Sequence, residues 1–454
     1  MGKVDDLGSV RTPRSILAFT CSSIVMMLFI SSYSVIDGAF ISNLIGTDAL
    51  AALNITMPAF SAFGSVAFMF AAGGSTIVAT MLGEGRTREA NRSTFQIFFA
   101  VGVIGICISM VITLFAEDVV RALGADDGLL PYCLEYWRAL APFVPLMMMQ
   151  FVSIQFAIVS GSPMLALASS VTGGFINIAL DWLFMGPLGM GMLGAALASG
   201  IGSAFVACIC IAHIASGRSG LRFEPSAVSA KVIVPACTNG SSEMASNMSS
   251  AVTVFLYNMV MMKHLGADGV SAITIISYVE FLAVAAIGGY SMGIDPVMSY
   301  CRGAKDRDGM RMVFAFSMKF IAVFSIAVFI LMEVFAGMVV SLFSGGSEHV
   351  EEIAVNGARL YSVSFLFMGF NIYGSALFTS LSNGLVSAVI ASIHGFVLLA
   401  PMILLLPELF GIDAVWLAVS VTEMITLAIT IRYIRKLGPV YGFYGKRRVE
   451  GQTI

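Results

Sequence analysis

Long runs of apolar residues, separated by short polar segments, occupy almost the whole chain. A helix that crosses the hydrocarbon core of a bilayer needs about 20 apolar residues. The runs are continuous rather than alternating, which favours helices over the strands of a membrane barrel. The pattern therefore predicts an all-α integral membrane protein. It has twelve spans, at residues 15–42, 49–82, 93–116, 131–159, 163–185, 191–216, 231–264, 269–300, 312–343, 353–381, 385–407 and 412–436.

Composition supports the same class of protein. Of the 454 residues, 58% are hydrophobic and 11% are charged, which is typical of a polytopic membrane protein and not of a soluble one. The first run is too long for a signal sequence, so an uncleaved first span is expected. The seven cysteines are scattered and predict neither a zinc site nor a disulfide framework. We expect the lipid bilayer as a partner, and no nucleic acid.

Lysine and arginine are distributed unevenly between the polar segments. If the N-terminus is cytoplasmic, the inner segments carry 19 of these residues and the outer segments carry 4. Cytoplasmic segments of membrane proteins are enriched in basic residues. The bias predicts a multi-pass protein of the cell membrane with both termini in the cytoplasm.

The two halves of the sequence resemble each other at an offset of 220 residues. Residues 45–53 match residues 265–273, and the basic loop at Gly83 matches the loop at Gly303. Six spans return the chain to the same side, so the halves are parallel and related by an axis along the membrane normal, as in one class of secondary transporters. We therefore predict two six-helix lobes, the N-lobe (residues 1–222) and the C-lobe (residues 223–454).

Two carboxylates stand out because they lie inside apolar runs of the N-lobe. Placing Asp37 or Asp181 in a membrane costs roughly 3 kcal/mol or more, which usually indicates an ion or substrate pathway. Asn177 shares a helix face with Asp181. At 1.5 Å per residue, both acids lie about 9 Å below the outer helix ends, Ser199 about 13 Å and Asn177 about 15 Å. This layer predicts a cation-coupling site, and the alternative is a hydrogen-bonded clamp between helices.

In the C-lobe, Glu243, Glu280 and Glu423 lie within apolar runs, each about 15–18 Å deep. Membrane acids rarely face lipid, so we expect these to line the cavity and to attract cationic substrates. The alternative for Glu243 is a hydrogen bond to a neighbouring serine or to Asn247. Asp295 is expected to be interfacial.

Three further residues are candidate substrate contacts: Met148, Gln150 and Asn371. Flexible methionines suit promiscuous binding surfaces, although residues 147–149 form a run of methionines that points all round its helix. The four histidines are dispersed, and we expect packing or interface positions for them.

Several motifs occur in the order and spacing of a known family. They are Asp37-Gly38 before Leu44-Ile45-Gly46 and Ala49-Leu50-Ala51-Ala52, Ala72-Gly73-Gly74-Ser75 before Leu82-Gly83-Glu84-Gly85, the segment Pro296 to Lys305, and Gly411-Ile412-Asp413-Ala414-Val415-Trp416. Together they resemble the multidrug and toxic compound extrusion (MATE) family over nearly the whole chain.

The resemblance implies an antiporter that exports drugs and metabolites while H⁺ or Na⁺ moves inward, with no enzymatic activity and no other cofactor. The cation site of the family corresponds here to Asp37, Asn177 and Asp181, which would be the metal ligands if the ion is Na⁺. Ser199 stands where the family commonly has threonine. Cys301 departs from an asparagine of the family. Residues 353–381 lack the acid of a Na⁺-coupled branch, and Asn371 is the nearest polar residue there.

The missing acid favours coupling in the N-lobe. Two acids close together there would raise the pKa of one of them toward neutral, which gives a slight preference for H⁺. The leading interpretation is a monomeric antiporter for amphipathic, often cationic compounds. A lipid-linked oligosaccharide flippase of the same superfamily is the alternative, although such flippases tend to have more spans and a cationic cavity. A membrane enzyme would need a cluster of histidine and aspartate at a membrane face, and a channel a re-entrant filter; neither is visible in the sequence.

Overall fold

The structure is a computed structural model that describes residues 7–218, 220–341 and 347–443, apart from the side chains of residues 34, 35 and 39. The two ends of the chain and residues 342–343 of the predicted ninth span lie outside this description. Within the described residues the secondary structure is helical.

The first half contains two short 3₁₀ turns, the short helix α4 and the apolar helices of the spans. They are η1 (Leu7–Ser9), α1 (Pro13–Leu44), α2 (Thr47–Gly83), α3 (Thr87–Leu114), α4 (Ala116–Ala122), α5 (Leu130–Leu140), η2 (Ala141–Phe143), α6 (Val144–Val159), α7 (Pro163–Met185) and α8 (Gly191–Ala215).

The second half follows the same plan. Its elements are α9 (Ala230–Gly303), α10 (Arg307–Ser341), α11 (Glu348–Ser362), α12 (Phe365–Ser380), α13 (Gly384–Ser392), η3 (Ile393–Leu399), α14 (Ala400–Phe410), η4 (Ile412–Leu417) and α15 (Ala418–Tyr441).

Counted as spans, the described helices confirm the predicted twelve. Helix α9 has 74 residues, but Gly266 has φ 64° and ψ −151°, so α9 is two spans joined by a sharp turn. Helices α5 and α6 form one span interrupted at Pro142, and α11 and α12 form one span bent by 52°. Proline removes a backbone donor and explains the first break. The bend after Ser362 has no comparable signal in the sequence.

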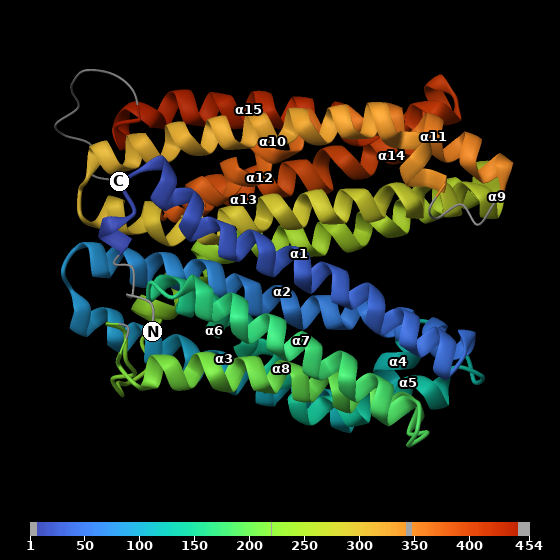
Figure 1. Ribbon diagram of the computed structural model, residues 1–454, viewed down its shortest axis with the longest axis horizontal. Coiled ribbons are helices and arrows are strands. Elements are labelled where there is room, and N and C mark those ends of the chain that lie inside the picture. Colours follow the sequence, from blue (N-terminus) through green and yellow to red (C-terminus); the bar gives the residue numbers. More distant parts are fainter. Residues whose placement is uncertain (1–6, 219, 342–346, 444–454) are drawn as a thin grey trace.

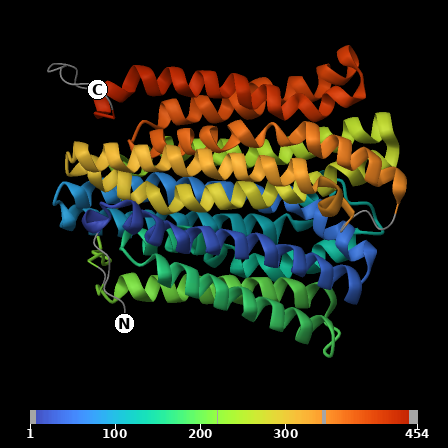
Figure 2. The same cartoon turned by 45° about the horizontal axis from the view of Figure 1, so that its top comes forward.

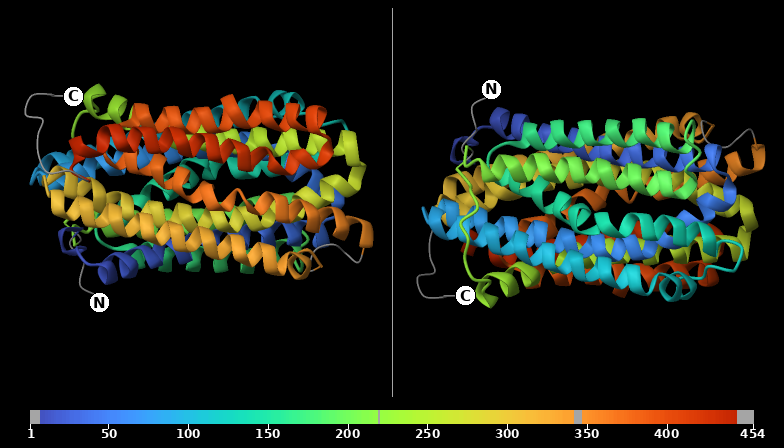
Figure 3. Two further views of the ribbon diagram at one scale, coloured as in Figure 1. Left: turned by 90° about the horizontal axis from the view of Figure 1, so that it is seen from above. Right: turned by 90° about the horizontal axis from the view of Figure 1, so that it is seen from below.

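The spans form two lobes that lie side by side. Helices α1–α8 make up one lobe and α9–α15 the other, and the first and last described residues lie at the same end of the bundle (Figure 1). We call this end the terminal end. The tilted view shows the two lobes as stacked groups of roughly parallel helices (Figure 2). In the views from above and below, α10 and α15 lie at one face of the molecule, and α3, α7 and α8 lie at the other (Figure 3).

The backbone turns repeat between the lobes. A left-handed φ recurs at an offset of 220 or 221 residues, at positions where glycine is favoured because it lacks a Cβ. The pairs are Gly46 with Gly266, Gly85 with Lys305, Gly161 with Ser382, and Gly191 with Gly411. Turns of the same kind at matched places support the internal repeat independently of sequence identity.

The lobes touch closely near the terminal end. A Cβ atom added at Gly83 would lie 2.2 Å from the carbonyl oxygen of Tyr300, and one added at Gly303 would lie 2.1 Å from that of Thr80. These two contacts exchange under the 220-residue offset, so the pseudo-twofold axis passes between them. We call the contact of residues 75–83 of α2 with residues 295–303 of α9 the lobe seam.

Two segments outside the spans pack against the helices at the terminal end. Between α8 and α9, Glu224 accepts from Arg88 Nε at 2.9 Å and from Arg92 Nε at 3.0 Å, which attaches the linker to α3. Before α1, Leu7 and Val10 are buried, and Arg11 pairs with Asp306 of the other lobe at 3.1 Å.

Candidate functional site

The acid pair of the N-lobe is formed by α1 and α7. The side chains of Asp37 and Asp181 meet directly. Asp181 is 0% exposed. Among the described residues, no donor group hydrogen-bonds to either of its carboxyl oxygens or to Oδ1 of Asp37. Two carboxyl groups this close in a low-dielectric setting cannot both remain charged, so the pair needs a shared proton or a bound cation.

Asn177 and Ser199 lie beside this pair, as their depth predicted. Asn177 is one turn before Asp181 on α7 and donates from Nδ2 to Ser199 Oγ of α8 at 3.5 Å. Its amide oxygen lacks a partner among the described donors and is therefore available to a ligand. Gly202 permits the close approach of α8, since a Cβ there would lie 3.0 Å from Cβ of Asn177. The structure thus gathers the four predicted residues in one place.

Two tyrosines complete the site, and the sequence analysis missed both. Tyr33 is one turn before Asp37 on α1, and Tyr136 of α5 reaches Ser199 with its hydroxyl group. Both tyrosines face the acid pair closely enough to interact with its charge. The four-residue spacing of Tyr33 and Asp37 was a usable signal. Tyr136 had none, because it lies on a different span and no sequence spacing connects it to the acids.

The donor atoms of the site indicate which ions it can bind. No group of three or more His, Cys, Asp or Glu side chains suited to a metal ion occurs in the described part of the chain. Two carboxylates with amide and hydroxyl oxygens are hard donors, which suit Na⁺, whereas a proton needs only the carboxylates. No lysine, arginine or histidine lies within ion-pair distance of Asp37 or Asp181 in the described residues.

A second buried polar group lies in the C-lobe around Glu423. Asn371 of α12 donates from Nδ2 to Glu423 Oε2 at 2.6 Å, and His394 Nε2 lies 3.0 Å from Oε1. Thr430 donates to the amide oxygen of Asn371 at 3.0 Å. His394 lies in the π-helical turn η3, a feature often found at functional sites. Packing was predicted for this histidine, but the structure makes it a partner of a buried acid.

Glu280 belongs to the same region. It contacts the hydroxyl group of Tyr361 and lies close to Tyr257, and it is near enough to Glu423 and His394 to interact with their charges. Two of the three predicted C-lobe acids therefore form one cluster with Asn371.

Glu243 stands apart from that cluster. It is half-buried on the first span of α9 and interacts with Asp295 of the second span. The neighbours proposed as its hydrogen-bond partners are engaged elsewhere: Ser242 with Thr379, and Asn247 with the main-chain oxygen of Glu243. Its carboxylate is thus not fixed by these neighbours. Asp295 is not interfacial as expected, because it is 5% exposed and lies between the lobes.

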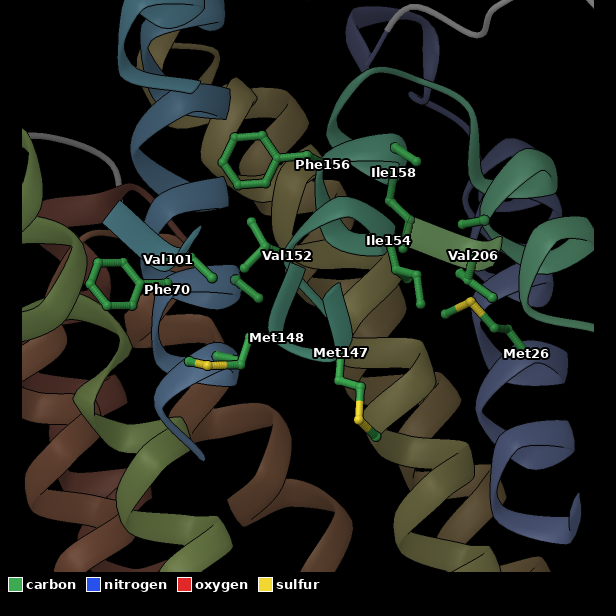
Figure 4. Packing of buried hydrophobic residues seen from close by; sticks show 14 of the residues in the cluster. Met26, Phe70, Val101, Met147, Met148, Val152, Ile154, Phe156, Ile158 and Val206 are labelled. Atoms are coloured by element: carbon green, nitrogen blue, oxygen red, sulfur yellow. The ribbon is translucent and has the colours of Figure 1, made fainter. Parts of the chain in front are cut away.

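Two predicted substrate contacts lie in the interior of the N-lobe. Met148 is 0% exposed, and Gln150 is 7% exposed. Met148 lies in the same hydrophobic cluster as Phe70, Val101 and Val152 (Figure 4). In this conformation Met148 fills the core, because the run of methionines turns one member toward α2 and α3, so pocket lining is not observed for it.

Comparison with known proteins agrees with the architecture. The family model MatE matches residues 22–183 and again residues 244–405. The chain belongs to the MatE family of membrane transporters. The two matches begin 222 residues apart, close to the offset of the predicted repeat.

Individual MatE relatives are distant but cover nearly the full length. The multidrug export protein MepA of Staphylococcus haemolyticus is 22% identical over 430 residues, which cover 91% of each chain. A solved outward-facing MATE transporter of the MOP superfamily has a TM-score of 0.90 at 19% identity and covers 97% of this chain and 99% of its own. A Vibrio cholerae MATE transporter has a TM-score of 0.88 at 19% identity and covers 96% of this chain and 99% of its own.

Proposed function

We propose that this MatE protein is an antiporter that exports amphipathic, often cationic compounds from the cell in exchange for an inward-moving cation. The observation that carries the proposal is the direct contact of Asp37 and Asp181 inside the N-lobe without a basic partner among the described residues. Such a pair of carboxyl groups can bind or release one proton or one monovalent cation at low energetic cost, and ion coupling requires this exchange.

Export of drugs is supported by the relatives. The similar staphylococcal proteins are named multidrug export proteins, and both lobes here carry buried acids. Membrane acids that are not fixed by neighbours, such as Glu243, favour a cationic cargo over the pyrophosphate of a lipid-linked oligosaccharide. One chain supplies both lobes, so the proposal requires only a monomer in the plasma membrane with its termini in the cytoplasm.

The proton is the favoured coupling ion. The acid pair can bind one proton without further ligands, and residues 353–381 of the C-lobe lack the acid that a sodium-coupled branch of the family has there. No residue of the N-lobe site excludes Na⁺ by charge, since carboxylate, amide and hydroxyl oxygens also suit that ion.

Purified protein in liposomes tests the proposal directly. We expect efflux of a fluorescent cationic dye to follow an imposed pH gradient in sodium-free buffer. A sodium gradient without a pH gradient should then give no more transport than liposomes without protein. Transport that needs sodium and ignores the pH gradient would overturn the preference for H⁺, and absence of transport under either gradient would overturn the antiporter itself.

A further inference from the structure

Asp295 is a buried carboxylate in the lobe seam, outside the N-lobe site and the C-lobe cluster. Asp295 is 5% exposed. Its Oδ1 accepts a hydrogen bond from Thr76 Oγ1 at 3.3 Å, and its Oδ2 accepts one from Ser75 Oγ at 3.4 Å. Both donors belong to α2 of the other lobe. Ser299, one turn further along α9, donates to Oδ1 at 3.4 Å. These hydroxyl groups join the lobes through one carboxyl group.

Its position relates it to the symmetry of the molecule. Ser75 and Asp295 are separated by 220 residues, so Asp295 touches its own equivalent in the other repeat. Only residues near the pseudo-twofold axis do this. The glycine contacts of the lobe seam lie between Asp295 and the terminal end, about 12 Å away at 1.5 Å per residue. With the seam closed, Asp295 is 5% exposed and has little contact with water.

Among the described residues, the groups that face Asp295 carry no compensating positive charge. Helix α2 contributes Ser75 and Thr76, and α6 contributes Gln155, which donates to Ser75. Helix α12 contributes Ser380, whose main-chain oxygen accepts from Ser299. The first span of α9 contributes the one titratable group among the described neighbours, Glu243, which is another acid.

A lone charged carboxylate is therefore poorly suited to the closed seam. Removing an ion from water without a counter-charge is expensive, and the usual response of such a group is to become neutral. A neutral carboxyl group still uses all of the hydroxyl partners, because it accepts on one oxygen and can donate from the other. When the lobes separate at this end, water would stabilise the charged form instead.

We propose that Asp295 is a second proton-binding site of the transporter, which holds a proton while the lobe seam is closed and releases it to water when the seam opens. A proton that binds one conformation more tightly shifts the equilibrium toward that conformation. Falling pH on the terminal side therefore favours the closed seam, and rising pH favours the open one. The site acts on conformation and is separate from ion exchange at Asp37 and Asp181.

A distance measurement across the two lobes tests this inference on the full chain in lipid nanodiscs. Spin labels are placed at the terminal end through Arg218→Cys on the N-lobe and Lys436→Cys on the C-lobe, after Cys21, Cys107 and Cys208 have been changed to serine. Double electron–electron resonance then gives the populations of short and long distances between pH 5 and pH 9. We expect the long-distance population to rise with pH.

Three variants separate the seam from the N-lobe site. Asp295→Asn mimics the protonated side chain and should keep the short distance across the whole pH range. Asp37→Asn should retain the pH response, even though it abolishes coupled transport. Asp308→Asn is the matched control, since it removes one exposed acid from the same end without touching the seam, and its profile should follow the unmodified protein.

The outcomes are decisive in either direction. If the unmodified protein shows no pH response, or if Asp295→Asn responds as the unmodified protein does, the inference is wrong. If Asp295→Asn does not fold, Thr76→Val replaces it: loss of a partner in the closed state should lower the midpoint pH by roughly half a unit or more. An unchanged midpoint in Thr76→Val would also overturn the inference.

Discussion

The buried acids of this chain differ in what surrounds them, and the surroundings indicate what each can do. Asp37 and Asp181 meet each other, so their state depends on a shared proton or ion. Glu423 is held by Asn371 and His394, which fix its position. Glu243 is held by neither its serines nor Asn247, so it remains available to a cargo. Residue type alone does not distinguish these cases.

Changing Asp37 to asparagine should abolish cation-coupled efflux and leave the protein folded in the membrane. The substitution removes the group that exchanges a proton or ion but keeps the size of the side chain. Dye efflux and size-exclusion profiles of the purified protein measure the two effects. Asp181→Asn should behave alike, and Asn177→Ala should reduce transport less, because it removes a neutral ligand. Normal efflux by well-expressed Asp37→Asn would contradict the assignment.

Changing Glu243 to glutamine should alter which compounds are exported more than how export is coupled. A half-buried carboxylate attracts cations, so the apparent affinity for cationic dyes should fall several-fold while that for neutral compounds stays unchanged. Competition assays in proteoliposomes measure both classes side by side. Glu333→Gln, on α10, is the control for loss of one acid from the C-lobe. Equal loss for cationic and neutral compounds would count against a role in attracting charge.

At the scale of elements, the contact of α2 with α9 is governed by glycines. Backbones can approach this closely only where a Cβ is missing, as in other membrane helix pairs. The glycines Gly83 and Gly303 of the lobe seam each face a carbonyl oxygen of the opposite helix. The same element contains Gly288, where an added Cβ meets nothing within 4 Å. Helix α9 thus provides both a critical glycine and its matched control.

Gly303→Ala should impair closure of the lobe seam, whereas Gly288→Ala should behave as the unmodified protein. The added Cβ of the first variant would lie 2.1 Å from the Thr80 oxygen, so the helices must move apart. We expect at least a several-fold fall in transport and a lower midpoint of thermal unfolding for Gly303→Ala. Parallel assays of the two variants measure this difference. Equal transport by both variants would show that the close contact is not needed during transport.

An ion pair of Glu224 attaches the linker between the lobes to α3, and this pair forms only above a certain pH. The Arg88 guanidinium, and then that of Arg92, hold the pKa of Glu224 below its ordinary value. For a lowered acid pKa, the stabilising contribution is complete above the ordinary value and is lost as pH falls through the lowered one. Exposed pairs contribute little to global stability, so the effect should be local.

Glu224→Gln should therefore raise amide hydrogen exchange in residues 222–229 at neutral pH, relative to the unmodified protein. The difference should vanish once the unmodified protein is acidified below the lowered pKa of Glu224, because its own pair is then lost. Exchange followed by mass spectrometry measures both profiles. Glu117→Gln, which breaks an exposed pair with Arg121, is the control and should leave the linker unchanged. A pH-independent difference would mean that the ion pair does not hold the linker.

At the scale of the whole molecule, the segment before α1 joins the two lobes at the terminal end. Leu7 and Val10 are 4% and 2% exposed, although they lie outside the spans. The neighbouring Arg11 pairs with Asp306 of the C-lobe. The segment therefore adds buried apolar contacts and one ion pair between the lobes at this end.

The double substitution Leu7→Ala with Val10→Ala should lower the unfolding midpoint of the purified protein by a few degrees. Loss of two buried apolar side chains costs roughly 2 kcal/mol or more in total. Tryptophan fluorescence during heating in detergent measures the change. Val228→Ala, at an exposed linker position, is the control and should not shift the midpoint. Equal midpoints for the two proteins would show that the segment does not contribute to stability.

The sequence by itself determined the spans, the two-lobe plan and four residues of the candidate site. It could do so because the bilayer demands about 20 apolar residues per helix and penalises each buried charge, so hydropathy and rare acids report depth directly. The 220-residue offset carried the symmetry. The depth of a residue along its helix could therefore be estimated from the sequence. This estimate placed Asp37, Asn177, Asp181 and Ser199 in one layer of the membrane.

Direction around a helix axis and contacts between distant helices were decided by the tertiary structure alone. Tyr136 of α5 reaches Ser199 beside the acid pair, and His394, in the π-helical turn η3, reaches Glu423. Met148 turned toward the core, and Asp295 toward the other lobe. The physical reason is that hydropathy is nearly uniform around such helices, so the pattern fixes how deep a side chain lies but not which neighbour it meets.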